Sequence, residues 1–203
     1  MNCRGHSQRI LIVQNWNINP IVHMKLLNNQ HVISDAGGSK ITDSYVLFKC
    51  SRKDNSSIID TICCSPTTAR DLCQLSHQTM PSFFNPLHQN GEGHGIGGNH
   101  PHQSWNQCRK QLYNIVLLLI AYFGSDKTNT PLYDIKIKLE EYTSFPPFFS
   151  YIKSVNTIIG NTKHGKFTNI INYLTENNNN LRNFPYELVL NELNNNNIEQ
   201  HFE

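Results

Sequence analysis

The clearest pattern of apolar and polar positions lies between residues 45 and 64. An apolar run at residues 45–48 is followed by a polar stretch at 52–57 and by a second β-prone run at 58–64. Two short β-prone runs around a polar turn predict a β-hairpin. This segment is the part of the chain in which the local signals agree best.

A helix is expected directly after the hairpin. Ser65, or alternatively Thr67 or Thr68, can cap its first turn, and Pro66 is suited to the first helical position. Apolar positions then recur at helical spacing on one stripe that can lie across a sheet, while Arg70, Asp71 and Gln74 are expected in solvent. The stripe consists of Ala69, Leu72, Cys73 and Ser76.

Alternation within the second strand predicts which of its faces meets the core. Side chains of a strand point alternately to its two faces. Asp60 shares a face with Ile62, so we expect the opposite face, with Ile59, Thr61 and Cys63, to be the buried one.

The segments on either side of the hairpin have weaker patterns. Residues 9–13 are a candidate strand, residues 15–20 break it, and 21–27 are a further short element. Residues 81–104 are rich in Gly, His, Asn and Pro, and a linker of this composition is expected to be flexible.

The second half of the chain predicts helices. Residues 107–123 fit a buried helix by length, although strand stays open for 113–123, and residues 131–142 are ambiguous in the same way. Three further helices are expected, separated by Gly or Pro, over residues 148–159, 166–174 and 185–193.

Composition sets limits on the chain's class. Of its 203 residues 38% are hydrophobic and 16% charged, and asparagine tracts occur at 177–180 and 194–197. Polar tracts bury little apolar surface, so loops or disordered tails are expected there. The net charge of +2 gives no argument for nucleic acid.

No pattern indicates an enzyme, a metal or another cofactor. The G-x-G-x-x-G at residues 93–98 has neither the preceding strand nor the following helix that a phosphate-binding loop needs. Histidines of the same stretch fit a linker better than a metal site, because no rigid frame holds further ligands. They are His88, His94, His100 and His102.

The cysteines and apolar runs indicate a cytoplasmic protein. None of the six cysteines forms a C-x-x-C pair, and the adjacent Cys63 and Cys64 are poorly placed for a mutual disulfide. The longest apolar run, at 115–123, is far shorter than the roughly 20 residues of a membrane helix. We therefore expect reduced thiols and no transmembrane segment, with peripheral membrane association left open.

The hairpin and helix together resemble the start of a Ras-associating domain, a ubiquitin-like β-grasp module of signal transduction. The resemblance is carried by the sequence PTTARDLCQL at 66–75 and by the hairpin turn KDNSS at 53–57 before it. Other ubiquitin-like modules, such as the first lobe of FERM domains, share this layout. The resemblance covers residues 44–80.

The resemblance implies a binding partner and a site. Members of the family recognise GTP-bound small GTPases of the Ras group by adding their second strand to the GTPase sheet. Pairing would run along residues 57–63, which include Ile58 and Ile59. The basic side chains that would meet the acidic effector loop are Lys49, Arg52, Lys53 and Arg70. Asp60 departs from the family's pattern, because an acid at this strand would repel that loop.

The predicted fold class is α+β: a partial β-grasp unit, then a low-complexity insert and a mainly helical C-terminal region. The expected division is an N-terminal extension, a β-grasp unit, a linker, a helical region and an Asn-rich tail, at 1–42, 43–80, 81–104, 105–193 and 194–203. The predicted function is a non-enzymatic adaptor that recognises a small GTPase or another protein. The alternative is a helical scaffold that binds no GTPase and in which the hairpin is incidental.

Overall fold

A computed structural model describes residues 1–88, 104–124 and 130–203. It divides them into two compact units. The sheet unit comprises residues 1–85 with 123–133, and the helical unit comprises the described residues of 86–122 and 134–203. The predicted α+β class is confirmed. The G-x-G-x-x-G motif and three of the linker histidines lie outside the described residues.

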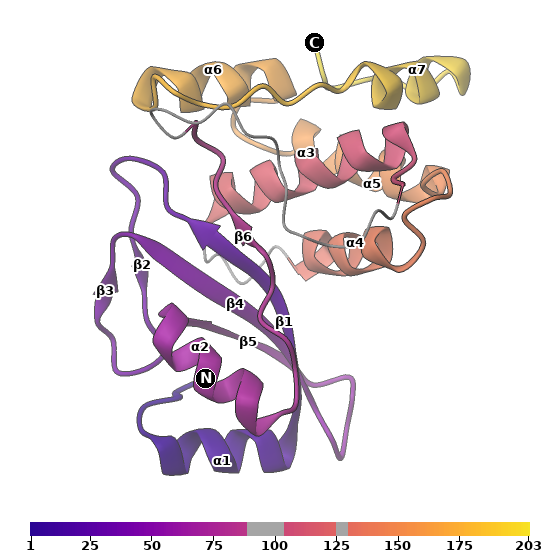
Figure 1. The fold of residues 1–203 in the computed structure, drawn as a ribbon. Helices are drawn as coiled ribbons and strands as arrows, with labels where there is room; N and C mark the ends of the chain where they lie inside the picture. Colours follow the sequence, from indigo (N-terminus) through magenta and orange to yellow (C-terminus); the bar gives the residue numbers. More distant parts are fainter. Residues whose placement is uncertain (89–103, 125–129) are drawn as a thin grey trace. The chain divides into compact units, whose positions relative to one another are not determined.

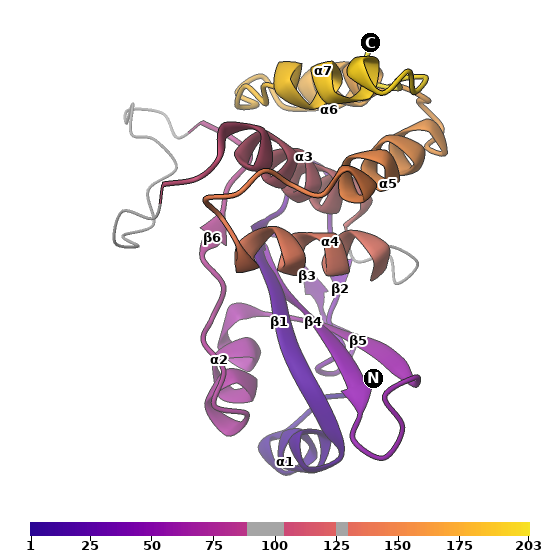
Figure 2. The same cartoon turned by 90° about the vertical axis from the view of Figure 1, so that its right-hand side faces the viewer.

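The sheet unit is built on four strands in the order β5-β4-β1-β6. Strand β4 pairs antiparallel with both β1 and β5, whereas β1 pairs parallel with β6. Figure 2 shows β1 as a long strand beside β4. The bounds are β1 Trp16–Lys25, β4 Ser44–Arg52, β5 Ile59–Cys64 and β6 Phe83–Phe84, and a separate ribbon pairs β2 Val32–Ile33 with β3 Lys40–Ile41.

The predicted hairpin and helix are confirmed as β4, β5 and α2 (Pro66–Leu75). Ser65 is the N-cap, and its hydroxyl accepts a hydrogen bond from the Thr68 amide at 3.4 Å. The stripe of Ala69, Leu72 and Cys73 is buried, as the helical spacing predicts.

The prediction of the core-facing side of β5 is correct only in part, because the strand is buried on both faces from Thr61 onward. The core between the sheet and the helices contains Ile62 and Cys64, which share a face with Asp60. Asp60 lies at the start of the strand, beside the ammonium group of Met1 at 3.4 Å, so its charge does not enter this core. Ile59, on the other face, is 47% exposed, although Thr61 and Cys63 on that face are buried.

The segment before the hairpin belongs to the sheet. The candidate strand at residues 9–13 is instead part of α1 (His6–Asn15), next to α2 (Figure 1). A four-residue apolar run does not distinguish strand from helix. Strand β1 runs through Pro20, the residue expected to break the chain, with a bulge between Pro20 and Val22. The residues expected to precede the first domain thus supply a central strand.

A strand also follows α2, in the segment expected to be linker. Phe83 and Phe84 of β6 pair with His23 and Met24 of β1, and the rings of His23 and Phe83 lie 4.8 Å apart. A two-residue strand between prolines is too short to produce a sequence pattern.

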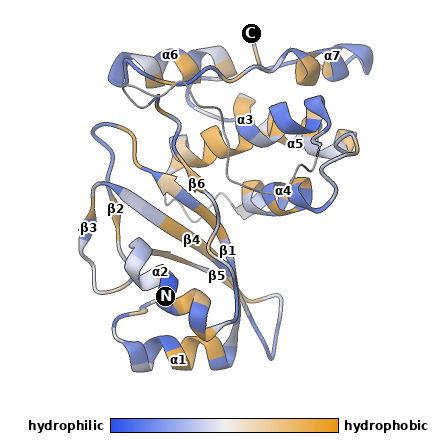
Figure 3. Ribbon diagram, in the orientation of Figure 1, coloured by the Kyte–Doolittle hydropathy of each residue, from blue (hydrophilic) through white to orange (hydrophobic). Residues whose placement is uncertain are grey.

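The helices of the second half of the chain have bounds close to the predicted ones, and all but the last residue of α3 and the first turn of α4 belong to the helical unit. Both ambiguous segments are helical, and the apolar character of α3 is visible in Figure 3. The bounds are α3 Gln107–Phe123, α4 Thr130–Glu141, α5 Phe149–Gly160, α6 Phe167–Asn177 and α7 Glu187–Asn195.

The side chain of Arg109 connects α3 to the segment between α4 and α5. It is 2% exposed and donates to backbone carbonyls rather than to a carboxylate. Its Nε lies 2.6 Å from Phe145 O and its Nη2 lies 3.0 Å from Pro146 O, while Nη1 donates to Lys138 O at 3.2 Å and to Leu139 O at 3.1 Å. One buried cation therefore fixes the end of α4 and the segment after it.

The asparagine-rich C-terminal segment, for which a loop or a disordered tail was expected, is packed. Phe202 is fully buried, and the amide of Phe167 donates to His201 O at 2.8 Å. The Asn156 side chain donates to Glu199 O and accepts from the His201 amide, both at 2.8 Å. Elsewhere in the unit, asparagines close helix ends by donating to the carbonyl four residues back, as Asn178 does to Leu174.

Candidate protein-binding surface

The outer edge of β5 is the candidate site, because β5 is a terminal strand of the sheet. The Arg52 amide donates to Ile58 O at 3.0 Å, and this bond sets the alternation of the ladder. In an antiparallel pair every second residue bonds its neighbour and the others face outward. The backbone groups of Ile59, Thr61 and Cys63 therefore point away from β4.

One end of this edge is already occupied by the chain itself. The Asp35 amide donates to Cys63 O at 2.8 Å, and the Cys63 amide donates to Asp35 Oδ2 at the same distance. The Thr61 amide donates to the carboxylate of Asp60 at 2.7 Å. Capping of this kind limits uncontrolled strand pairing. Three outward backbone groups remain for which the described residues provide no neighbouring strand. They are the N–H and C=O of Ile59 and the C=O of Thr61.

Four of the predicted partner-binding residues surround this open end. Ile58 and Ile59 are 42% and 47% exposed. Arg52 Nη2 lies 2.6 Å from Asp54, and Lys53 Nζ donates to Val13 O at 2.8 Å; both contacts are exposed. The hairpin therefore brings two apolar and two basic side chains together.

The other two predicted residues lie elsewhere. Lys49 lies opposite Thr61, on the face of β4 that alternates with the core residues Phe48 and Cys50. Arg70 is exposed on α2, which packs on the core face, and its charge acts on His23 of β1. Lys49 and Arg70 thus lie on opposite sides of the sheet and do not form one basic patch.

Two acidic residues at the edge were not expected to act together. The Met1 ammonium group lies 3.4 Å from both Asp35 and Asp60. The like charges of the two carboxylates, one of which caps Cys63, therefore share a cation. Asp35 lies 28 residues before Cys63 in the sequence, and no local pattern identifies it as part of this edge.

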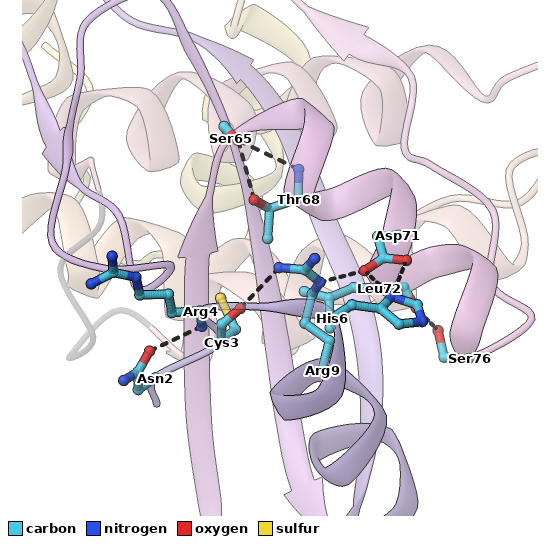
Figure 4. Close-up of polar contacts among 10 residues, drawn as sticks. All are labelled: Asn2, Cys3, Arg4, His6, Arg9, Ser65, Thr68, Asp71, Leu72 and Ser76. Atoms are coloured by element: carbon cyan, nitrogen blue, oxygen red, sulfur yellow. Dashed lines mark hydrogen bonds and ion pairs between the residues drawn. The ribbon is translucent and has the colours of Figure 1, made fainter.

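Asp71 holds α1 against α2 (Figure 4). Its carboxylate contacts Arg9 Nε and lies 3.0 Å from His6 Nδ1, and Arg9 Nη1 also donates to Cys3 O at 3.1 Å. Burial acts to raise the pKa of Asp71, but the hydrogen bonds and charges of His6 and Arg9 outweigh it, so the pKa is lowered. The expectation that Asp71 points into solvent is wrong, and its role here is to stabilise the fold.

The described residues hold no group of three or more His, Cys, Asp or Glu side chains that could bind a metal ion. All six cysteines are free thiols, and five of them are buried. The backbone of His88 is held by Asn180, because the His88 amide donates to Asn180 O at 2.7 Å.

Comparisons with known proteins find no match among family models, curated proteins or solved structures. Among the helices of the described residues, none has the length and apolar character needed to cross a membrane.

Proposed function

We propose that this chain is a non-enzymatic adaptor module that binds a protein partner by strand addition at the open end of β5. A small GTPase of the Ras group is the partner class to test first, since the sequence of the hairpin and α2 resembles a Ras-associating domain. The observation that carries the proposal is an edge strand with an unpartnered backbone segment at Ile59, next to exposed isoleucines and basic side chains.

Strand addition needs both backbone groups and side-chain contacts. An added strand gains affinity from main-chain hydrogen bonds and specificity from alternate side chains. Ile59 supplies an outward N–H and C=O, and Ile58 and Ile59 supply apolar surface. The cap at Cys63 limits the added strand to a short segment, which favours a transient complex.

Two exposed basic side chains near Ile59 can meet carboxylates of a partner, although Asp35, Asp54 and Asp60 lie at the same edge. Arg52 and Asp54 form an exposed pair, with side chains 43% and 63% exposed. Such surface pairs contribute about 0–1 kcal/mol, so Arg52 can exchange Asp54 for a partner's carboxylate at little cost. Lys53 lies beside it in the turn. Complementary charge of this type acts mainly on association rate and partner choice.

A proline at position 59 tests the strand addition. Because the N–H of Ile59 faces away from β4, Ile59→Pro removes an outward donor without removing a bond of the β4–β5 ladder. Ile59→Ala is the matched control, since it loses the same apolar side chain but keeps the N–H. We would titrate each purified chain with Ras and with Rap loaded with a GTP analogue, and verify folding by circular dichroism.

The proposal predicts saturable, nucleotide-dependent binding tighter than about 100 μM, weakened by a further factor of about five or more in Ile59→Pro relative to Ile59→Ala. Charge reversal by Arg52→Glu should slow association and flatten the salt dependence. Binding that does not depend on the nucleotide, or the absence of saturable binding, would exclude the GTPase as the partner. Equal affinities of the two position-59 variants would exclude strand addition.

The helical-scaffold alternative has less support. It treats the hairpin as incidental, whereas β4 is paired on both sides within a four-stranded sheet. Its remaining form, a protein that binds partners through the helical unit alone, predicts that substitutions at position 59 change no interaction.

A further inference from the structure

Three exposed aromatic side chains lie close together between α4 and α5. Tyr142, Phe145 and Phe148 are 61%, 64% and 65% exposed. Single apolar residues on a surface are ordinary, but a group of large ones often marks a binding site. No charged residue occurs from position 143 to 152, although the exposed Lys138–Glu141 ion pair lies just before Tyr142.

The backbone here has the features of a polyproline II segment. The sequence is Phe145-Pro146-Pro147-Phe148. Proline fixes its own φ near −65°, and the residue before a proline is confined to extended conformations. Phe148 has φ −63° and ψ 137°, close to the polyproline II values. This helix has about three residues per turn, so Phe145 and Phe148 are one turn apart and share a face.

Arg109 holds the segment in place from its inner side. The guanidinium donates to the carbonyls of Phe145 and Pro146 at 2.6 and 3.0 Å. The Tyr151 amide donates to Phe148 O at 3.0 Å, and the rings of Phe148 and Tyr151 meet edge to face at 5.6 Å. The backbone is thus fixed while the two phenylalanine rings remain in solvent, and a segment ordered in advance loses less entropy on binding.

We propose that residues 145–148 are a docking segment for a protein domain whose aromatic-lined groove binds polyproline II ligands. The Phe145 and Phe148 rings would enter apolar pockets of that groove, and the two prolines would lie along it. The segment has no cluster of basic residues, which an acidic lipid surface requires, so it fits such a groove better. This site is in the helical unit and does not depend on the β5 edge.

The test removes both rings from the full chain. Phe145→Ala/Phe148→Ala is compared with the wild type and with Tyr173→Ala, which removes an aromatic ring that is 38% exposed on α6. The rings are exposed, so the double variant should fold, and circular dichroism verifies this. The probes are three purified domains, one each of the SH3, WW and EVH1 classes, titrated by calorimetry.

We expect at least one probe to bind the wild type with a Kd below about 100 μM, and the double variant to bind about tenfold or more weakly, with Tyr173→Ala unchanged. The proposal is overturned if none of the three probes binds at that level, or if the double variant binds as the wild type does. Two other outcomes also overturn the proposal. Self-association through the rings, seen by light scattering, would assign them to contact with a second copy of the chain. Sedimentation with neutral lipid vesicles through the rings would assign them to a membrane.

Discussion

Replacing Arg109 by methionine tests whether one buried cation organises the helical unit. Methionine keeps the length and much of the apolar stem of arginine but has no donor. In the structure the guanidinium supplies all four hydrogen bonds to carbonyls of residues 138, 139, 145 and 146. Burial lowers the pKa of Arg109, but an arginine remains charged at neutral pH.

The expected magnitude follows from burial. A hydrogen bond to a charged group contributes about 1.5–3 kcal/mol, but the desolvation of the guanidinium offsets several kcal/mol of the total. The hydrogen bond to Leu139 O is buried. In Arg109→Met this buried carbonyl therefore loses its guanidinium donor. The carbonyl groups of Phe145 and Pro146 belong to exposed residues and can accept hydrogen bonds from water instead. We therefore expect Arg109→Met to cost about 1–3 kcal/mol, the cost of leaving a buried neutral acceptor unsatisfied.

Urea unfolding followed by circular dichroism at a helical wavelength measures this cost. With an m-value of about 2 kcal/mol/M, the midpoint should fall by about 1 M. Arg109→Lys should lose about half as much stability, because an ammonium group has three donors at one point and does not span four carbonyls. The control is Lys153→Met at an exposed position of α5. A midpoint for Arg109→Met as high as that of the control would refute the reasoning.

Two further predictions concern single side chains. Burial, and secondarily the charge of Arg70, lower the pKa of His23 in the folded chain. The unfolded chain therefore binds more protons than the folded chain as the pH falls. The stability contributed by neutral His23 is present above its ordinary pKa of 6.5 and is lost as the pH falls through that value toward the folded pKa. Thermal melts of His23→Gln should thus show a smaller decrease between about pH 7 and 5 than the wild type, and an unchanged decrease would contradict the assignment. Asn156→Ala removes both side-chain bonds to residues Glu199 and His201 and should cost about 1–3 kcal/mol. Limited proteolysis should then cleave the C-terminal residues faster, and an unchanged cleavage rate would show that the burial of Phe202 and the backbone hydrogen bonds of residues 201 and 202 hold them without Asn156.

The parts of the fold that the sequence predicts are those set by neighbouring residues. Ser65 and Pro66 fix the start of α2, and the stripe at Ala69, Leu72 and Cys73 fixes its buried side. Strand β6 and the pairing of β1 with β4 depend on contacts between distant segments, and the run at residues 9–13 is compatible with both helix and strand. The burial of Ile62 and Cys64 was not predicted, because Asp60 on their face of β5 can lie at the edge of the core beside another charge.

The candidate site divides in the same way. Arg52, Lys53, Ile58 and Ile59 lie together because they belong to one hairpin, and the sequence alone places them there. The cap by Asp35 comes from the loop between β2 and β3, 28 residues before Cys63, and no local pattern predicts this contact. Arg109 was equally hidden, because its partners are backbone carbonyls about thirty residues away rather than a carboxylate that a charge pattern would reveal.

Strand addition at the open end of β5 is tested directly by amide hydrogen exchange of the chain, with and without a GTP-analogue-loaded Ras or Rap protein. The N–H of Ile59 faces outward, so in the absence of a partner it should exchange quickly, whereas the Cys63 amide, bonded to Asp35, should already be slower. We expect a saturating concentration of the partner to slow the exchange of the Ile59 amide. Saturation without protection at Ile59, or with protection confined to the helical unit, would contradict strand addition.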